Sequence, residues 1–343
     1  MTLLPPPTPW LATSLLLLLA LGGTPGSSAA QEGTSRPQTA ERHLGVLFWH
    51  PSPNDFAALE GIRRGLTDAG IRHRLEVREA KEDEATARRI LGEFEAAGVE
   101  LVFALGTRAA LLAAEELEST PIVFTAVTSP VESGLVPSWE GSGRNLAGNS
   151  NWVKPRTLVR VFQLAVPGLE RLGILRSRRS GLVSGAELQG MRRFLESDGA
   201  PRLELVEEVV EDPLGLPRAV QRLLDAGVQA LWIPIDFEVY ENLDRVLDTL
   251  GPGSIPLVSS SVKGAQAGAV AGVLADYQLL GRRAVVLARA ILEEGLEPWR
   301  LPIETMQGSQ VVVNLSAARR CGYELPLSLL VLADRILEEE PEL

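Results

Sequence analysis

Small polar and hydroxyl-bearing residues follow the apolar runs of this sequence at one position after another. His50 and Ser52 come after the first such run, and Gly106 with Thr107 follows a later one. In a parallel sheet the carboxyl ends of the strands share one edge, where ligands bind, so we expect these residues to gather around a bound molecule. The predicted ligand-binding residues are Trp49, His50, Ser52, Gly106, Thr107, Thr125, Ala126, Thr128, Asn149, Ser150, Asp236, Phe237, Ser259 and Ser260.

The types of these residues indicate the chemistry of the molecule that they would bind. Hydroxyl groups and the free amides of helix N-termini favour a carboxylate, because both offer unpaired donors to negative charge. Asp236 would complement an ammonium group, and Trp49, Trp152 or Phe237 is available to cover an apolar or aromatic part. The set therefore predicts a zwitterion such as an amino acid. Each Ser, Thr or Asp taken singly has a second interpretation, as the N-cap of a helix.

Enzyme signatures are absent from the sequence. It has no G-x-x-x-x-G-K-S/T phosphate loop, no dinucleotide fingerprint after the first apolar run, and no H-E-x-x-H or G-x-S-x-G motif. Its single cysteine, Cys321, excludes an intramolecular disulfide framework, and its 3 histidines have no metal-ligand spacing. We therefore expect no catalysis, no cofactor and no metal. His50 beside Ser52, with a distant aspartate, leaves a secreted hydrolase as an alternative.

Length and charge limit the class of protein. The 343 residues exceed one ordinary domain, and a hydrophobic fraction of 45% can bury substantial cores, which favours two lobes. The 33 basic and 44 acidic residues give a formal net charge of -11. Such a charge disfavours nucleic acid and anionic membranes as partners. We expect a monomer that binds a small molecule.

Residues 1–30 have the order of a secretory signal peptide. An apolar stretch from Trp10 to Gly22 precedes Ser28-Ala29-Ala30, a small-residue site where cleavage is expected near Ala30. The run is short for a bilayer span of ~20 residues, and an uncleaved anchor is the alternative interpretation. Residues 31–42 are expected to be a polar linker. The mature chain should then be periplasmic or secreted.

From residue 43 onward, strand-like apolar runs alternate with segments of helical period, which is typical of parallel βαβ units. A Gly- and Ser-bearing stretch, Ser138 to Asn151, interrupts the alternation and is the predicted hinge. We predict an α/β fold of two doubly wound parallel-sheet lobes joined by this hinge, with one large sheet as the alternative. The predicted strands are 44–49, 74–78, 101–105, 121–126, 145–148, 171–175, 203–210, 230–235 and 256–259, and helices of the second half are 156–166, 186–195, 216–226 and 239–250.

Several of these segments also resemble a known family, the ABC-transporter substrate-binding proteins of the tryptophan/tyrosine type, which have the type I periplasmic-binding-protein fold. The resemblance covers most of the mature chain, and the joint order of the segments is specific. The segments are ALGTRAA (104–110), PIVFTAVTSPVESGLV (121–136), RNLAGNSNW (144–152), LWIPIDFEV (231–239), PLVSSSVKGAQAGAVAGVLADYQLLGR (256–282) and VVVNLSAARRCGYELPLSLL (311–330).

The resemblance implies two lobes joined by crossovers, with a ligand between them. It implies a first lobe of residues 43–150 with a returning helix in 276–300, and a second lobe of residues 151–275 with 301–343. The chain departs from the family at Ser129, where an aspartate is common, at Asp236-Phe237-Glu238, where the family has Asp-Asn-Thr, and at a shortened first loop, His50-Pro51-Ser52. The ligand contacts carried over by position are Thr107, Thr125, Thr128, Ser150, Asp236 and Ser260.

The leading hypothesis from the sequence is reversible capture of a ligand by lobe closure, followed by transfer to a membrane ABC permease. A ligand-sensing subunit of a membrane signalling receptor shares the same expected features and is a further alternative.

Overall fold

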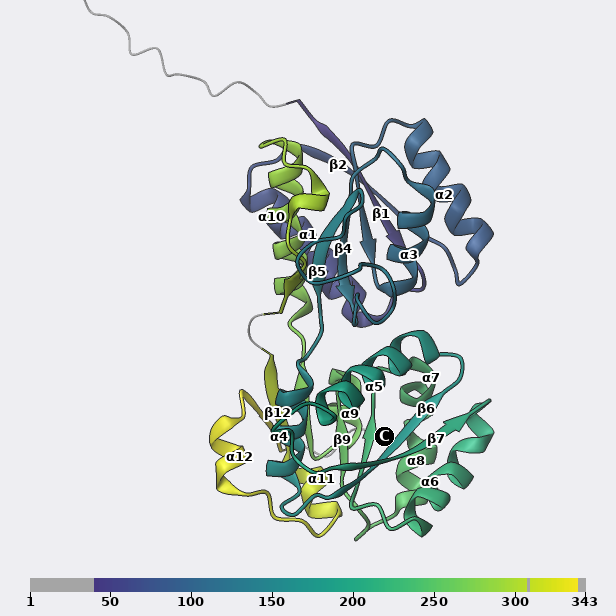
Figure 1. Ribbon diagram of the computed structural model, residues 1–343, viewed down its shortest axis with the longest axis vertical. Helices are drawn as coiled ribbons and strands as arrows, with labels where there is room; N and C mark the ends of the chain where they lie inside the picture. Colours follow the sequence, from purple (N-terminus) through teal and green to yellow (C-terminus); the bar gives the residue numbers. More distant parts are fainter. Residues whose placement is uncertain (1–39, 307–308, 339–343) are drawn as a thin grey trace, which may run out of the picture. The chain divides into compact units, whose positions relative to one another are not determined.

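The computed structural model describes residues 40–306 and 309–338. The predicted signal peptide and most of the predicted polar linker lie outside the described residues. None of the helices in the described part of the chain combines the length and apolar character that a bilayer span requires. The described residues form two separate sheets covered by helices, a two-lobed α/β architecture (Figure 1).

The first lobe is built on a 6-stranded sheet in the order β11-β5-β4-β3-β1-β2, in which every pairing is parallel. Such a sheet is buried on both faces, which explains the continuous apolar runs of its central strands. The strands are β1 (Arg42–Phe48), β2 (His73–Glu79), β3 (Leu101–Leu105), β4 (Ile122–Val127), β5 (Leu146–Ser150) and β11 (Glu304–Thr305).

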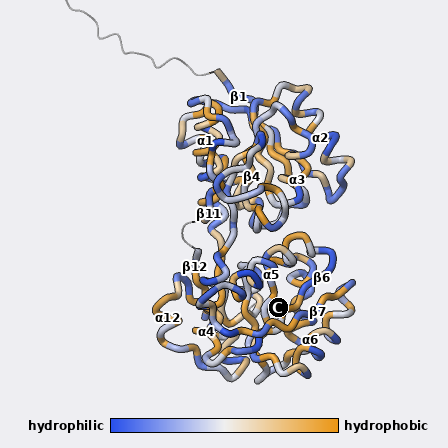
Figure 2. The backbone as a smooth tube through the Cα atoms, viewed as in Figure 1, coloured by the Kyte–Doolittle hydropathy of each residue, from blue (hydrophilic) through white to orange (hydrophobic). Residues whose placement is uncertain are grey.

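Two helices cover each face of this first sheet. Apolar side chains of α1 (Pro53–Asp68) and α10 (Tyr277–Leu292) pack with one set of strand residues, and those of α2 (Glu84–Ala96) and α3 (Thr107–Glu116) pack with the alternate set. The alternation of hydrophilic and hydrophobic colours along α2 in Figure 2 is that of a helix with one buried face. Each apolar strand residue therefore reaches one of two cores.

Close packing of α10 on α1 fixes the start of α10 (Figure 1). A Cβ added at Gly281 would lie 2.0 Å from the carbonyl oxygen of Ala58, and one at Gly61 would lie 2.2 Å from that of Gln278. Only glycine allows the two helix backbones to approach this closely. Tyr277, the first residue of α10, is thereby held near Asn54 and Asp55 at the start of α1.

The second lobe is built on a 7-stranded sheet in the order β13-β12-β10-β9-β8-β6-β7. Only the pairing of β12 with β10 is antiparallel among these described strands. The strands are β6 (Arg171–Ser177), β7 (Glu204–Val210), β8 (Ala230–Ile233), β9 (Leu257–Ser259), β10 (Ala271–Leu274), β12 (Gln310–Asn314) and β13 (Arg335–Leu337).

Helices also cover both faces of the second sheet. One core contains residues of α4 (Pro155–Ala165), α5 (Gly181–Leu195), α11 (Leu315–Arg320) and α12 (Leu327–Leu332), and the other contains residues of α6 (Leu216–Asp225), α7 (Phe237–Glu241) and α8 (Leu243–Leu250). Trp232 is fully buried in the first of these cores. The remaining short helices are η1 (Pro213–Gly215), α9 (Val262–Ala267) and η2 (Pro298–Arg300).

The structure differs from the sequence expectations at a few boundaries. Residues 301–343 were expected with the second lobe, but β11 pairs with β5 and extends the first sheet. The helix expected over 186–195 begins at Gly181, because the glycines and serines of its first turns gave no apolar period. The helix expected over 239–250 is two helices that meet at Asn242, whose φ of -119° lies outside the helical region.

Candidate functional site

Hydroxyl and amide side chains pair with one another at the carboxyl ends of β4 and β5. The Thr125 hydroxyl donates to Asn149 Oδ1 at 2.7 Å, and Asn149 Nδ2 donates to the carbonyl oxygen of Leu280 in α10 at 2.9 Å. Both side chains are buried, so these neutral bonds replace water completely. Two predicted ligand residues, Thr125 and Asn149, are thus brought together.

A second neutral network continues from the next residues of the same strands. Thr128 Oγ1 donates to Asn151 Oδ1 at 3.0 Å, and Asn151 Nδ2 donates to the hydroxyl of Tyr277 at 2.9 Å. The Ser150 hydroxyl donates to the carbonyl oxygen of Val127 at 2.7 Å. Thr128 and Ser150 therefore lie in one polar cluster with the start of α10.

The backbone is strained at the end of β4 and in the loop that follows it. The pairing of β4 with β5 shifts register between Phe124 and Val127, and both Ala126 in β4 and Ser129 in the loop have positive φ angles, 58° and 52°. Non-glycine residues rarely hold such angles, which cost free energy and concentrate at functional sites. Ser129 is fully buried, and its hydroxyl has no hydrogen-bond partner in the described part of the chain. The structure places unusual backbone at a predicted ligand loop.

The starts of α1 and α3 lie close to each other in the first lobe. Ser52 caps α1 in a reciprocal capping box with Asp55, and burial raises the pKa of Asp55 while its bonds to Ser52 oppose this rise. A Cβ built on Gly106 would lie 3.9 Å from Asp55 Oδ1. Gly106 precedes α3 with a φ of 85° and gives it no side-chain cap, so the first amides of α3, beginning with the buried Thr107, are available to an acceptor.

His50 and Trp49 have partners other than a nucleophile. His50 is exposed, and its Nδ1 lies 3.5 Å from Glu79 Oε1. The Ser52 hydroxyl donates to Asp55 Oδ2 at 2.7 Å, so the described contacts of Ser52 and His50 do not form a catalytic triad. Trp49 is half-buried, with the guanidinium of Arg108 5.8 Å from its ring centre.

At the carboxyl end of the second sheet, the Asp236 carboxylate accepts hydrogen bonds from two neighbouring segments of the chain. Its Oδ2 accepts the amide of Ser177 at 2.7 Å, and its Oδ1 accepts the hydroxyl of Ser177 at 2.9 Å and the amide of Val239 at 3.1 Å. The Asp236 side chain is fully buried and caps α7. Both oxygens already hold donors of the protein, which is the capping alternative that the sequence left open.

Two serines at the end of β9, Ser259 and Ser260, have different surroundings. Ser259 is fully buried and shares a 2.8 Å hydrogen bond with the Tyr240 hydroxyl. Ser260 accepts the indole N–H of Trp232 at 3.0 Å, and its hydroxyl lowers the pKa of the nearby Glu187 carboxyl. Phe237, also a predicted ligand residue, exposes 49% of its surface.

Glu187 of α5 is a buried acid of this polar region that could not be inferred from the strand ends. It is 4% exposed, and its Oε2 accepts the amide of Ile235 just after β8 at 2.7 Å. Burial raises its pKa to about 7 against the opposing hydrogen bonds of Ile235 and Ser260. Its sequence signal is a charged residue on the apolar face of α5, between Ser184 and Met191.

Among the described residues no cluster of His, Cys, Asp and Glu could hold a metal ion. The described polar groups offer hydrogen bonds and charge. Such a set can bind and orient a small molecule through donors, acceptors and a buried carboxyl.

Comparison with known proteins decides the family. The model of the ABC transporter substrate-binding protein family matches residues 45–337. The chain belongs to this family. A tyrosine-binding protein of Clostridioides difficile strain R20291 is 25% identical over 295 residues, which are 84% of this chain and 83% of the relative.

Solved structures show the same fold as this substrate-binding protein. A domain from Streptococcus pneumoniae in complex with L-Trp superposes with a TM-score of 0.75 at 22% identity, covering 87% of this chain and 100% of that one. A ligand-free, open substrate-binding protein from Clostridium difficile gives a TM-score of 0.70 at 21% identity, with 87% and 100% covered. The type I periplasmic-binding-protein fold expected from the sequence is confirmed.

Proposed function

We propose that this protein is the extracytoplasmic solute-binding component of an ABC importer, and that it captures an amino acid or a related zwitterion by closure of its lobes. The observation that supports this most is the gathering of polar side chains at the carboxyl ends of strands in both sheets, from Thr125 and Asn149 in one to Ser260 in the other. Ligands of open α/β sheets bind at such ends.

The first lobe offers groups that suit the carboxylate of an amino acid. The uncapped start of α3 at Gly106 and Thr107 presents amide donors together with the favourable end of the helix dipole. Relatives described as tyrosine-binding and as a complex with L-Trp support an aromatic amino acid. The half-buried Trp49 and the exposed Phe237 offer aromatic surfaces to its side chain.

Lobe closure is supported by the chain path. The chain passes from one sheet to the other after β5, before α10 and after β11. A ligand that contacts both lobes would favour the closed form by its differential affinity for that form. The permease of the importer would then recognise the closed protein, which acts as a monomer. The signal peptide would direct export, and its cleavage near Ala30 would leave the mature protein in the periplasm or outside the cell.

A thermal-shift screen of the purified protein against the proteinogenic L-amino acids tests this function, with isothermal titration for any hit. A true ligand at 100 times its Kd stabilises the folded state by about 2.7 kcal/mol, because it binds only that state. We expect a saturable rise in Tm, with tyrosine and tryptophan first, and a smaller radius of gyration in solution scattering on binding. If no amino acid raises Tm, the proposed ligand class is wrong.

A further inference from the structure

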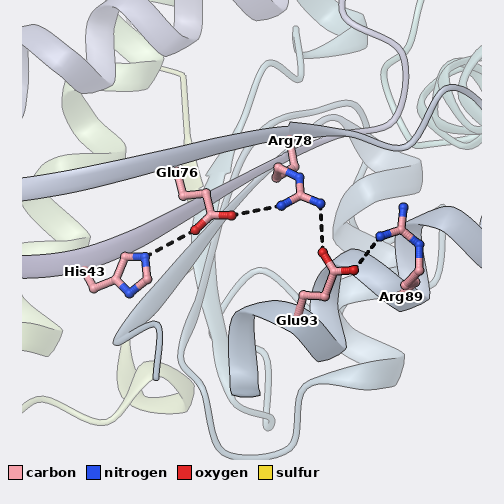
Figure 3. A network of polar contacts seen from close by, with 5 residues as sticks. All are labelled: His43, Glu76, Arg78, Arg89 and Glu93. Carbon is pink, nitrogen blue, oxygen red and sulfur yellow. Dashed lines mark hydrogen bonds and ion pairs between the residues drawn. The ribbon is translucent and has the colours of Figure 1, made fainter. Parts of the chain in front are cut away.

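Arginine partners accompany many acidic side chains of the described residues, but not the buried acid Glu187. On the surface of the first lobe, Arg78 joins Glu76 at 3.0 Å and Glu93 at 2.7 Å, in a chain of ion pairs that ends at His43 and Arg89 (Figure 3). Glu187 forms no ion pair with any Arg, Lys or His side chain that the structure describes. A buried carboxylate without a cation is costly, and such groups are usually paired.

Glu187 lies beside the predicted ligand residue Ser260 of the second lobe. Its carboxylate accepts the amide of Ile235, just after β8, and the Ser260 hydroxyl, just after β9, opposes the rise of its pKa. Burial raises the pKa of the Tyr277 phenol, and the charges of Asp55 and Glu187 add to this rise; the Tyr277 oxygen accepts a hydrogen bond from Asn151. A carboxylate accepts about four hydrogen bonds, so Glu187 keeps capacity for a further donor.

Other acids of this region are arranged differently. Asp236 accepts the amide and hydroxyl of Ser177, and Asp55 is bound to Ser52. Glu132 is joined to Arg193 through Oε1, while Glu132 Oε2 and Glu238 Oε2 are buried without a hydrogen-bond partner among the described residues. Glu187 differs from these acids because it is buried without a basic partner and accepts the amide of Ile235, at the polar strand ends of the second sheet.

We propose that Glu187, rather than Asp236, is the specificity-determining carboxylate that binds the ammonium group of the ligand. The assignment rests on the proposed function. The ammonium nitrogen would donate to the Glu187 carboxylate at the ends of β8 and β9, while Asp236 keeps its structural role. A ligand that carries a cationic nitrogen would be selected over a neutral isostere, because only the cation compensates the buried charge.

The test compares amino acids with analogues from which the amino group has been removed. The purified wild-type protein and Glu187→Gln are titrated with L-tyrosine, L-tryptophan and their deamino analogues by calorimetry. We expect the wild type to bind the amino form about 10- to 100-fold more tightly than the deamino form, and Glu187→Gln to lose this preference. Glu241→Gln, which changes an exposed acid of α7, is the matched control and should bind as the wild type does.

A pH series gives a second readout that a purely structural role would not produce. Because burial holds the pKa of Glu187 at about 7, its ionised form grows as pH rises, and wild-type affinity for the amino form should increase about tenfold from pH 6 to pH 8. Tyr240 and Tyr277 face Glu187, and burial raises the pKa of both phenols away from this range. The charge of Asp236 acts on Tyr240, that of Asp55 acts on Tyr277, and Arg176 lies near the start of α5. Glu187→Gln should show no such increase.

The outcomes separate the two proposals. If wild type binds an amino acid and Glu187→Gln binds it equally well with the same preference over the deamino form, the role of Glu187 is refuted and the transport function stands. Equal wild-type binding of amino and deamino forms also refutes the role of Glu187. If the wild type binds no amino acid at all, the proposed function fails and the role of Glu187 fails with it.

Discussion

The carboxyl ends of the two sheets satisfy their buried polar groups in different ways. In the first lobe, Thr125 pairs with Asn149 and Thr128 pairs with Asn151, so the strand ends are held by neutral groups. In the second lobe, Asp236 gathers donors from Ser177, and Glu187 lies buried nearby without a basic partner. These first-lobe pairs do not titrate, while the strand ends of the second lobe hold buried carboxyl groups.

This difference suggests that the two lobes would contribute differently to ligand binding. Neutral pairs such as Thr125 with Asn149 fix the shape of a surface at little electrostatic cost. A buried carboxyl such as Glu187 costs free energy in the empty protein, and a cationic ligand would recover it on binding. The first lobe would then orient the ligand and the second would select its charge. Substitutions in each lobe can break or sharpen this comparison.

The largest expected loss of stability comes from the substitution Asp236→Ala. The substitution leaves the buried donors of Ser177 and the amide of Val239 without an acceptor, which should lower the free energy of unfolding by about 4 kcal/mol. Urea denaturation followed by circular dichroism measures the loss. Glu241→Ala, which removes an exposed acid of the same short helix, should stay within about 0.5 kcal/mol of wild type. A loss below about 1 kcal/mol in Asp236→Ala would show that its bonds do not hold the lobe together.

The next effect is a pH dependence that belongs to the second lobe. Folding raises the pKa of Glu187 from 4.5 to about 7, so the fold favours its protonated form. This contribution is fully present below pH 4.5 and is lost as pH rises through 7, by about 3 kcal/mol in total. Glu187→Gln removes the titration. Without ligand, we expect Glu187→Gln to gain about 3 kcal/mol over wild type between pH 4.5 and pH 8.

Urea midpoints of both proteins at several pH values measure this difference directly. Effects of all other titrating groups cancel in the comparison. A difference that stays constant with pH would mean that the pKa of Glu187 is the same in the folded and unfolded protein. A variant that is more stable yet binds less tightly would show that Glu187 is kept for function, since sites often sacrifice stability for activity.

Much of the fold was predictable because buried parallel strands leave a simple pattern. Runs such as Leu101–Leu105 are apolar throughout and were located at their exact bounds. The two-residue strand β11 was missed, because Glu304 and Thr305 have no apolar pattern and pair only where β5 offers an edge. The break between α7 and α8 depends on the local conformation of Asn242, which composition does not indicate.

The site was predictable where it follows strands and not where it lies on helices. Thr125 and Ser260 follow apolar runs directly, so their positions could be inferred from the sheet. Ser177 is the last residue of β6, and its position at that strand end was a usable signal that was missed. Glu187 sits within α5, and its approach to Ile235 depends on how that helix packs against the sheet. The ligand roles of the predicted residues stay predictions.

The smallest effect is expected in the first lobe, from Thr125→Val. Valine keeps the shape of threonine but removes the donor to Asn149 Oδ1, leaving a buried acceptor unsatisfied at a cost of about 2 kcal/mol. Because neither side chain ionises, the cost should be the same at pH 5 and pH 8, measured by urea denaturation. A cost that changed with pH would place a titrating group beside Thr125 and remove the distinction between the lobes. A constant cost there, beside a pH-dependent difference at Glu187, would confirm that the paired strand ends of the first sheet are held by neutral groups while a titrating carboxyl lies at those of the second.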